Sequence, residues 1–281
     1  MKTICVTGSA SGIGAATAEI LRADGHRVIG VDRHDADVVG DLSQVADRVR
    51  IVDEVNALCD GRLDGLVPCA GVSTPAPNSL VVSVNYFGTL AVVNGLRPSL
   101  ARGTDPAVVM ISSNSTTMTP GLPVAEAMRY LQSDEASVLE RFAAPDGFLA
   151  YPAGKLAIAF WVRMNAGTAD WIGSGIRLNA VAPGVIDTGM TRPLLDIPGV
   201  KESLEHIPIP LKRWGRPDEI ARAIRFLLRA IRRTSSVRSC SSMVAPTRCC
   251  NRPLILIRFR RRRRSFHDVA RHRSDGVVAG E

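Results

Sequence analysis

Short apolar runs alternate with longer amphipathic stretches along residues 1–190. The short runs are rich in Val, Ile and Leu and predict strands, whereas the longer stretches have a helical spacing of apolar positions and predict helices. The predicted strands are Thr3–Thr7, His26–Asp32, Leu63–Cys69, Ala107–Ser112 and Ile176–Ala182. The predicted helices are Ile13–Asp24, Ser43–Cys59, Leu80–Leu100 and Tyr151–Ala169. This alternation predicts right-handed βαβ units, and hence an α/β fold with one doubly wound parallel sheet covered on both faces.

One segment interrupts the alternation. Residues 114–150 form an insert that the βαβ pattern does not require, and long connections of this kind are often functional or interface elements. Within it, Leu122–Phe142 is amphipathic and predicts one further helix. A last helix is expected from Pro217 to Leu228, because a first-turn Pro with acidic neighbours favours a helix start. We therefore expect a single domain over residues 1–228.

Composition narrows the class of protein. The chain has 281 residues, of which 46% are hydrophobic, as suits one large globular domain. No stretch reaches the ~18 uncharged apolar residues of a membrane span. The first strand follows Met1-Lys2 directly, without a secretory leader, so a cytoplasmic protein is expected. The His and Cys residues lack metal-ligand spacing, and no metal site is predicted.

The net charge of +8 is unevenly distributed. Residues 229–281 contain 14 Arg, no Lys and 3 acidic residues, giving +11, so residues 1–228 carry 8 − 11 = −3. This Arg-rich tail has no strand or helix period, and we expect it to be disordered. Although it includes the run Arg260–Arg264, it has no nucleic-acid-binding motif and no interleaved aromatic residues. No specific nucleic-acid partner is therefore expected.

A glycine-rich segment joins the first strand to the first helix. In this segment Gly8 permits a tight turn, Gly12 lets the backbone approach a pyrophosphate, and Gly14 allows close helix–strand packing. The free N–H groups and partial positive charge of the helix N-terminus favour phosphates. Together these features predict a Rossmann-type dinucleotide site. Its expected contacts are Gly8, Ser11, Gly12, Ile13 and Gly14.

Acidic residues after the second strand indicate which dinucleotide is bound. Asp32 ends that strand, where a carboxylate would accept hydrogen bonds from ribose hydroxyls and repel a 2′-phosphate. This favours NAD over NADP, although Arg33 follows and could bind a phosphate. Asp41, beside Leu42, could meet the adenine amino group or belong to the cap of the following helix.

A tyrosine and a lysine lie four residues apart in Tyr151-Pro-Ala-Gly-Lys155. This spacing places both side chains on one face of a helix. A phenol is a poor acid at neutral pH, and a nearby ammonium is expected to lower its pKa and make proton exchange practicable. The spacing alone is weak evidence for catalysis, since many solvated helices have it. The predicted dinucleotide site in the same chain strengthens this evidence.

These residues together resemble the short-chain dehydrogenase/reductase family. The matching segments, in the family's order, are Thr7–Gly14, Asp32, Cys69-Ala70-Gly71, Asn85, Ser113, Tyr151 with Lys155, and Pro183–Thr188. Within the family, the chain is similar to the bacterial 3-alpha-hydroxysteroid dehydrogenase/carbonyl reductase subgroup in Leu66–Gly71, in Ser83–Gly88 and in its insert. The insert implies an altered subunit interface.

The resemblance implies a role for each catalytic residue. Tyr151 would be the general acid/base, and Lys155 would hold the nicotinamide ribose and lower the pKa of Tyr151. Ser113 would hydrogen-bond the substrate oxygen, in preference to the adjacent Ser112. Asn85 would bind a water that relays protons from Lys155.

The resemblance also implies further cofactor and substrate contacts. The segment after the last strand would cover the nicotinamide, through Pro183, Gly184, Val185, Ile186 and Thr188. Cys69, Ala70 and Gly71 would lie against adenosine, although the family has Asn-Asn-Ala-Gly where this chain has Pro68-Cys69-Ala70-Gly71. Residues 189–207, including Met190, would form a lid over an alicyclic or steroid-like alcohol or ketone.

The family activity implied is hydride transfer between NAD(H) and a secondary alcohol or ketone. The alternative is a nucleotide-binding protein without turnover, because the C-terminus departs from the family. Where a final strand ending in Val-Asp-Gly-Gly should follow Leu228, the Arg-rich tail begins. Ser241–Pro246 can encode Val-Asp-Gly-Gly-Thr in a shifted reading frame, so we predict a frameshifted tail that has lost this strand. A homodimer is expected only with an intact C-terminus.

Overall fold

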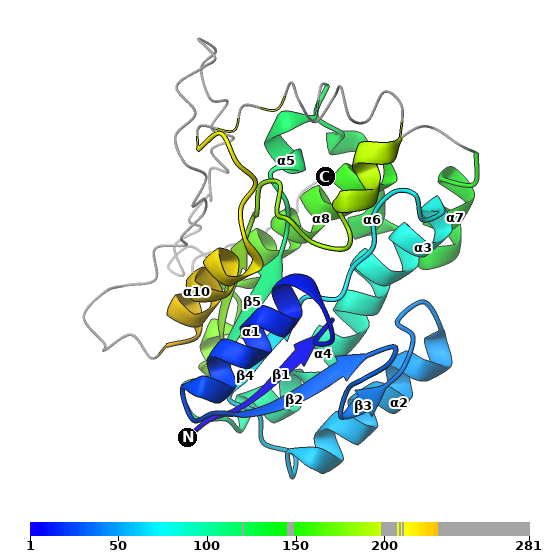
Figure 1. Cartoon of the computed structure of the whole chain (residues 1–281). Helices are drawn as coiled ribbons and strands as arrows, with labels where there is room; N and C mark the ends of the chain where they lie inside the picture. The colour runs from blue at the N-terminus through cyan, green and yellow to red at the C-terminus, as the bar shows by residue number, and fades with distance from the viewer. Residues whose placement is uncertain (120, 145–148, 198–206, 208, 210, 230–281) are drawn as a thin grey trace, which may run out of the picture. The chain divides into compact units, whose positions relative to one another are not determined.

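The computed structural model describes residues 1–119, 121–144, 149–197, 207, 209 and 211–229 (Figure 1). All of them belong to one compact unit, Met1–Thr247. Beyond Arg229, the predicted tail lies outside the described residues, so the frameshift, the lost strand and the disorder stay predictions. The predicted end of the domain at residue 228 also stays a prediction.

Six parallel strands form one sheet in the described part of the chain, in the order β3-β2-β1-β4-β5-β6. The strands are β1 (Thr3–Thr7), β2 (Arg27–Asp32), β3 (Val38–Val39), β4 (Gly65–Pro68), β5 (Ala107–Ile111) and β6 (Arg177–Val181). The order reverses between β1 and β4, which is the point where a doubly wound sheet opens a crevice. The predicted fold class is confirmed, and only the two-residue β3 was missed.

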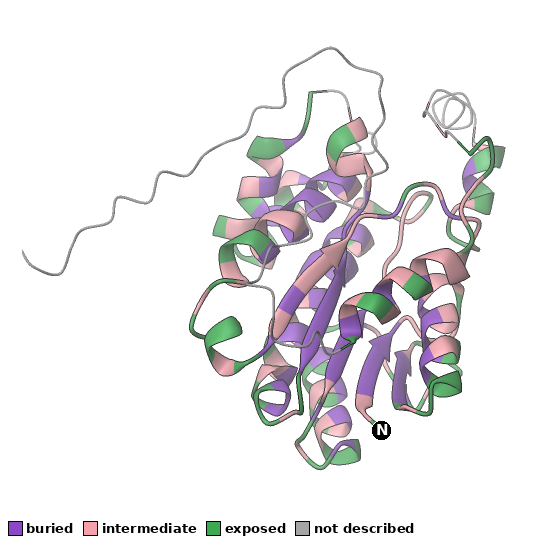
Figure 2. Cartoon of the chain, turned by 90° about the vertical axis from the view of Figure 1, so that its left-hand side faces the viewer, coloured by how far each residue is buried: buried purple, intermediate pink, exposed green. Residues whose placement is uncertain are grey.

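Helices cover both faces of this sheet, and each face has its own apolar core (Figures 1 and 2). Successive strand residues point to opposite faces. On one face, Ile4 and Val6 join the core formed with α1 (Gly12–Ala23) and α10 (Pro217–Leu228). On the other face, Cys5 belongs to the core that includes α2 (Val45–Leu58), α4 (Thr89–Ala101) and α8 (Ala150–Asn165).

Within the insert, the stretch Leu122–Phe142 contains two helices where the sequence predicted one. They are α6 (Val124–Gln132) and α7 (Glu135–Arg141), after the short α5 (Ser115–Met118). The prediction of a continuous helix over Leu122–Phe142 is therefore wrong. The break has a local cause, because the Asp134 side chain accepts a hydrogen bond from the Ser137 amide at 2.8 Å and caps a new helix.

The predicted helix Leu80–Leu100 is also interrupted. It consists of α3 (Asn78–Val82), a π-helical segment η1 (Ser83–Gly88) and α4. The whole stretch Asn78–Ala101 is long and apolar enough to cross a membrane, but 61% of its apolar window is buried inside the fold. Its hydrophobicity is accounted for by the core, where Val92, Val93 and Leu96 are fully covered. Short 3-10 turns, η2 (Ile172–Ser174) and η3 (Arg192–Asp196), complete the described helices.

Candidate active site

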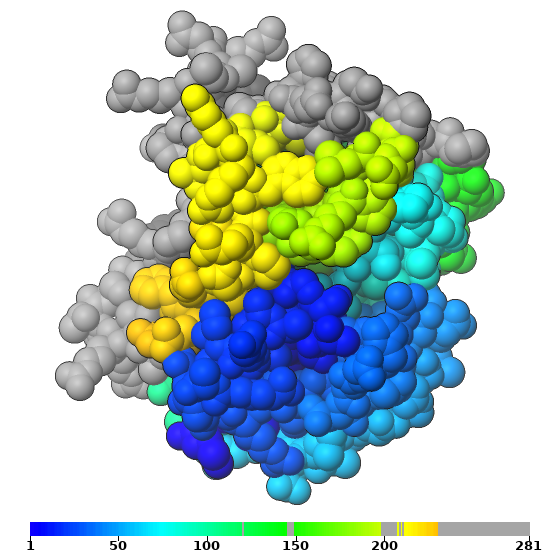
Figure 3. Space-filling model, viewed as in Figure 1, coloured from blue at the N-terminus to red at the C-terminus, as the bar shows by residue number. Residues whose placement is uncertain are grey.

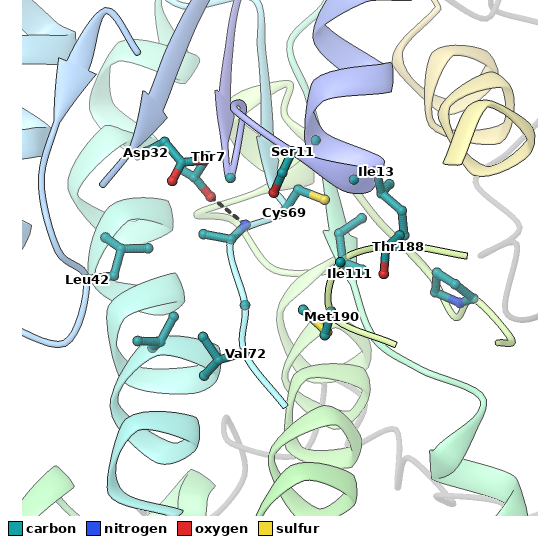
Figure 4. A pocket seen from close by; sticks show the side chains of 18 of the residues that line it. Thr7, Ser11, Ile13, Asp32, Leu42, Cys69, Val72, Ile111, Thr188 and Met190 are labelled. Carbon is teal, nitrogen blue, oxygen red and sulfur yellow. Dashed lines mark hydrogen bonds between the residues drawn. The ribbon is translucent and has the colours of Figure 1, made fainter. Parts of the chain in front are cut away.

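A cleft lies at the carboxyl ends of the strands, where the loops after β1, β2, β4, β5 and β6 converge (Figure 4). This is the position at which open α/β sheets bind ligands. Tyr151 and Lys155, both on α8, also line this cleft. In Figure 3 the described residues that follow β6, up to residue 197 (yellow-green), stand above the N-terminal residues (blue).

The glycine loop has the geometry that the sequence predicted. Gly8 and Gly12 have positive φ angles of 70° and 54°, which a side chain would oppose. A Cβ on Gly8 would lie 2.8 Å from the backbone of Ala70, and one on Gly14 would lie 1.9 Å from the Gly8 carbonyl oxygen. The Ser11 side chain makes no cap hydrogen bond to α1, so it leaves the first amides of the helix facing the cleft.

Asp32 is oriented by the loop. Its carboxylate accepts hydrogen bonds from the Ala10 amide at 2.9 Å and from the Arg33 amide at 2.7 Å. Both Asp32 and Arg33 line the cleft. The residue expected to favour NAD and the residue that could bind the 2′-phosphate of NADP therefore lie at the same edge. Because each carboxylate oxygen accepts a hydrogen bond, the orientation of the Asp32 side chain is fixed.

Asp41 and Leu42 form the next part of the wall. The Asp41 carboxylate accepts a hydrogen bond from the Ser43 amide at 2.8 Å, as expected for a residue of a helix-capping turn. Both residues nevertheless line the cleft. The capping alternative thus has a geometric basis, and contact with adenine stays a prediction.

The segment Cys69-Ala70-Gly71 forms the floor of the cleft. The Ala70 amide donates to Thr7 Oγ1 at 3.0 Å, which fixes this segment against β1 (Figure 4). Burial raises the pKa of Cys69 to about 12, so the thiol is neutral at physiological pH. At the position where the family has an asparagine, this chain therefore has a small uncharged side chain.

Asn85 does not line the cleft; it braces the floor from behind. Its amide donates to the Val72 carbonyl and its carbonyl accepts from the Val72 amide, both at 2.8 Å. It lies in η1, and π-helical segments are common at functional sites. Val72 uses one donor and one acceptor of the Asn85 amide, and the expected binding of a water stays a prediction.

The two serines after β5 have different partners. Ser112 Oγ donates to the Lys155 carbonyl at 2.9 Å and is directed toward α8. The Ser113 hydroxyl accepts a hydrogen bond from the Ser115 amide at 3.2 Å and lines the cleft together with Tyr151. The substrate-binding role of Ser113, rather than Ser112, stays a prediction.

Tyr151 and Lys155 face each other within the cleft. Lys155 Nζ lies 5.8 Å from the centre of the Tyr151 ring and donates to the Ile111 carbonyl at 2.9 Å. Burial raises the pKa of the Tyr151 phenol, and the nearby Ser113 hydroxyl only partly opposes this rise. The expected lowering of this pKa by Lys155 stays a prediction. Burial also lowers the pKa of Lys155 to about 8.

The burial of Lys155 predicts a pH-dependent stability. Below pH 8 the ammonium is charged in the folded and unfolded chains, and the burial penalty is fully present. As pH rises from about 8 toward 10.5, the folded chain loses this proton first and the penalty fades. Relative to Lys155→Met, the wild-type chain should gain about 2–3 kcal/mol between pH 7 and pH 10. Urea unfolding of both proteins at the two pH values measures this, and an unchanged difference would contradict it.

The loop after β6 is tied down at both ends. The Pro183 carbonyl accepts from the Asn114 amide at 2.9 Å, and the Val185 carbonyl accepts from the Gly215 amide at 2.9 Å. Pro183, Gly184, Ile186, Thr188 and Met190 line the cleft, as predicted. Val185 is not among the residues that line the cleft. Residues 198–206 of the predicted lid lie outside the described residues.

Several cleft residues were missed by the sequence reasoning. They are Val31, Gly40, Val72, Leu80, Val84 and Ile111. All except Leu80 lie one or two positions from a predicted contact, and this adjacency was the available signal. In the part of the chain that the structure describes, no group of His, Cys, Asp and Glu is gathered that could hold a metal ion.

Comparison with known proteins decides the family. The short chain dehydrogenase family matches residues 2–125, and the family described as Enoyl-(Acyl carrier protein) reductase matches residues 135–236. The 3-alpha-hydroxysteroid dehydrogenase/carbonyl reductase of Comamonas testosteroni is 38% identical over 233 residues, which cover 81% of this chain and 90% of the relative. The chain belongs to the short-chain dehydrogenase/reductase family.

Two further relatives support this assignment. The 3-alpha-hydroxysteroid dehydrogenase from Pseudomonas sp. B-0831, solved in complex with NADH, matches with a TM-score of 0.77 and 43% identity, covering 81% of this chain and 89% of that one. The coniferyl-alcohol dehydrogenase of Pseudomonas sp. (strain HR199 / DSM 7063) is 31% identical over 241 residues, 80% of this chain and 89% of the relative. The predicted family resemblance and enzyme class, an oxidoreductase acting on CH–OH groups, are confirmed.

Proposed function

We propose that this short-chain dehydrogenase/reductase uses NAD(H) to interconvert a secondary alcohol and its ketone, on a hydroxysteroid-like or other alicyclic substrate. The observation that carries the proposal is the meeting of Ser113, Tyr151 and Lys155 in the cleft that also contains the glycine loop. These groups supply a substrate-oxygen partner, a proton donor or acceptor, and a cation within one site.

The cleft residues fit a dinucleotide. Gly8 and Gly14 let the loop pack against Ala70 and α1 more closely than any side chain would allow, and the residues at the start of α1 line the cleft, where their amides would bind a pyrophosphate. Asp32 and the floor segment at Ala70 would hold the adenosine ribose. Lys155 would hold the nicotinamide ribose. When bound, the nicotinamide accepts or supplies the hydride.

The protein's own part is to position the substrate and move its proton. In the oxidative direction, ionised Tyr151 would take the hydroxyl proton as the C–H bond breaks; in reduction, neutral Tyr151 would donate it. Ser113 would hold the substrate oxygen beside the phenol. Because burial raises the pKa of Tyr151, its ionisation requires added positive charge, which Lys155 and an oxidised nicotinamide would provide.

The substrate class is inferred from apolar surface. Val72, Leu80, Val84 and Met190 line the cleft, and Met190 is 36% exposed. Several apolar side chains in the cleft that also contains Ser113 and Tyr151 suit an alicyclic ring with one reacting oxygen. The hydroxysteroid relatives act as independent support for the same class.

A substrate panel tests the proposal. Alicyclic secondary alcohols, including 3-hydroxysteroids, and their ketones would be assayed with NAD and NADP by nicotinamide absorbance. We expect turnover of ring substrates with NAD and little with matched linear alcohols. NADH binding without turnover on any substrate would favour the alternative of a nucleotide-binding protein. The same panel is then run on a chain in which residues 229–281 are restored to the other reading frame. Its turnover tests whether the tail limits activity, and its oligomeric state tests whether the tail prevents a homodimer.

Cofactor choice has a separate test in Asp32→Ser. Because loss of a charged hydrogen-bond partner costs about 1.5–3 kcal/mol, kcat/KM with NAD should fall by about 10–100-fold. Activity with NADP should rise, since the repelling carboxylate is gone and Arg33 remains at the same edge. Steady-state kinetics with both cofactors measures this, and an unchanged NAD/NADP ratio would contradict the role of Asp32.

A further inference from the structure

Arg48 of α2 is the one buried arginine among the described residues, with 6% of its surface exposed. It lies outside the cleft wall. Burial of a guanidinium is costly unless its donors are satisfied. The hydrogen-bond partners of Arg48 therefore indicate which parts of the fold this side chain connects.

Arg48 contacts three separate parts of the chain. Its Nε donates to the Leu42 carbonyl at 2.6 Å, and its Nη2 donates to the Ser83 carbonyl at 3.2 Å. Its two terminal nitrogens donate to the two carboxylate oxygens of Glu135, at 2.5 and 2.8 Å. Such a bidentate pair fixes direction as well as distance.

Each partner belongs to an element that shapes the site. Leu42 lines the cleft on the side expected for adenine. Ser83 begins the π-helical segment that contains Asn85. Glu135 opens α7 and thus belongs to the insert, residues 114–150. One guanidinium therefore joins the cofactor cleft, the helix that braces its floor, and the insert.

Leu42 has little freedom on its other side. A Cβ on Gly88 would lie 2.6 Å from the Leu42 carbonyl oxygen, so the backbone of Leu42 is packed directly against the end of η1. Arg48 holds the same carbonyl oxygen from within α2. The position of this part of the cleft wall is consequently set by two contacts, one steric and one charged.

The surroundings of Glu135 favour its charged form. Burial opposes this charge, but the hydrogen bonds from Arg48 and the nearby Ser83 hydroxyl outweigh burial and hold the pKa of this carboxyl below its ordinary value. Glu135 also lies at a helix N-terminus, where negative charge is favoured. Buried ion pairs often add little net stability, which leaves positional specificity as their usual contribution.

We propose that Arg48 and Glu135 are a positioning pair, through which the insert fixes the Leu42 wall of the cleft and so sets affinity for the adenosine half of the cofactor. The inference rests on the proposed function, because it requires that the cleft binds a dinucleotide. It assigns to α7 a task at the active site in addition to any role at a subunit interface.

Arg48→Lys is the first test, because lysine keeps the charge but cannot reach Leu42, Ser83 and both Glu135 oxygens together. We expect the Kd for ADP-ribose, measured by calorimetry on the full chain, to rise by about 10-fold. KM for NAD should rise by a similar factor, while kcat at saturating NAD changes by less than about 2-fold. Glu135→Gln, which leaves the bonds to Leu42 and Ser83, should show the same split at smaller size.

Arg141→Lys is the matched control. Arg141 pairs with Glu126 at 2.8 Å and joins α7 to α6 within the insert. Its substitution loosens the insert itself, and the Kd for ADP-ribose should stay unchanged. Equal weakening in Arg141→Lys would overturn the proposal in favour of general loosening of the insert.

The remaining outcomes separate the two hypotheses. If the wild-type chain binds neither NADH nor ADP-ribose, the proposed function fails. If it binds both and Arg48→Lys binds ADP-ribose equally well, only the positioning role fails. If Arg48→Lys and Glu135→Gln both fail to fold, as judged by circular dichroism, the pair serves the stability of the fold and the positioning role is overturned.

Discussion

Replacing Tyr151 with phenylalanine is expected to lower kcat by about 10³-fold, within the 10²–10⁴-fold that a positioned acid/base contributes. The change removes one hydroxyl, at a residue that lines the same cleft as Ser113. The ring stays in contact with the same neighbours, so Kd for NADH should change by less than about 3-fold. Stopped-flow or steady-state kinetics together with NADH fluorescence titration measure both quantities.

Tyr86→Phe is a control for the loss of a phenol elsewhere. Tyr86 is 3% exposed and packs edge-on against Phe87, outside the cleft wall. Its substitution should leave kcat within about 3-fold of the wild-type value. If Tyr151→Phe retained more than a tenth of the wild-type kcat, another group would have to carry the proton, and the assignment would be abandoned.

The second large effect is expected at Gly14. A Cβ there would lie 1.9 Å from the Gly8 carbonyl oxygen, and neither atom belongs to a flexible side chain. Gly14→Ala must therefore move α1 away from the glycine loop, at a cost of about 1–3 kcal/mol for overpacking. Because the loop and the helix N-terminus together face the pyrophosphate position, the Kd for NADH should rise by about 100-fold.

Gly167→Ala is the matched control for this substitution. No heavy atom lies within 4 Å of the position of its Cβ, and its φ angle is not in the left-handed region. We expect its Kd for NADH and its unfolding midpoint to equal those of the wild-type chain. An unchanged NADH affinity in Gly14→Ala would show that the loop tolerates the displacement, against the dinucleotide assignment.

Sequence patterns predicted the sheet well for a physical reason. Strands such as Thr3–Thr7 are buried on both faces, so a continuous apolar run marks them, and the observed β1 has the predicted limits. The insert was harder, because one amphipathic period runs through Ser133 and Asp134. Only the capping contact from Ser137 to Asp134 reveals that a second helix starts there.

The candidate site was predictable where a motif fixes the backbone. The glycine loop, Asp32, Ser113, Tyr151 and Lys155 lie in one cleft because each follows a strand or lies on the helix expected for it. Tertiary contacts decided the rest. Arg48 has the sequence surroundings of a surface helix residue, and only the fold brings Leu42, Ser83 and Glu135 to it. The direction of the Tyr151 pKa also depends on burial, which no spacing shows.

The π-helical segment Ser83–Gly88 restricts how this chain can change in length. A π-helical turn contains one residue more than an α-helical turn, so deletion of one residue here would restore a regular helix and turn the side chains of this segment to new directions. Asn85 would then no longer face Val72, although nothing apolar had been lost. This apolar stretch therefore tolerates substitutions but not insertions or deletions. In alignments of homologous sequences, gaps should be absent from it even where its residues differ.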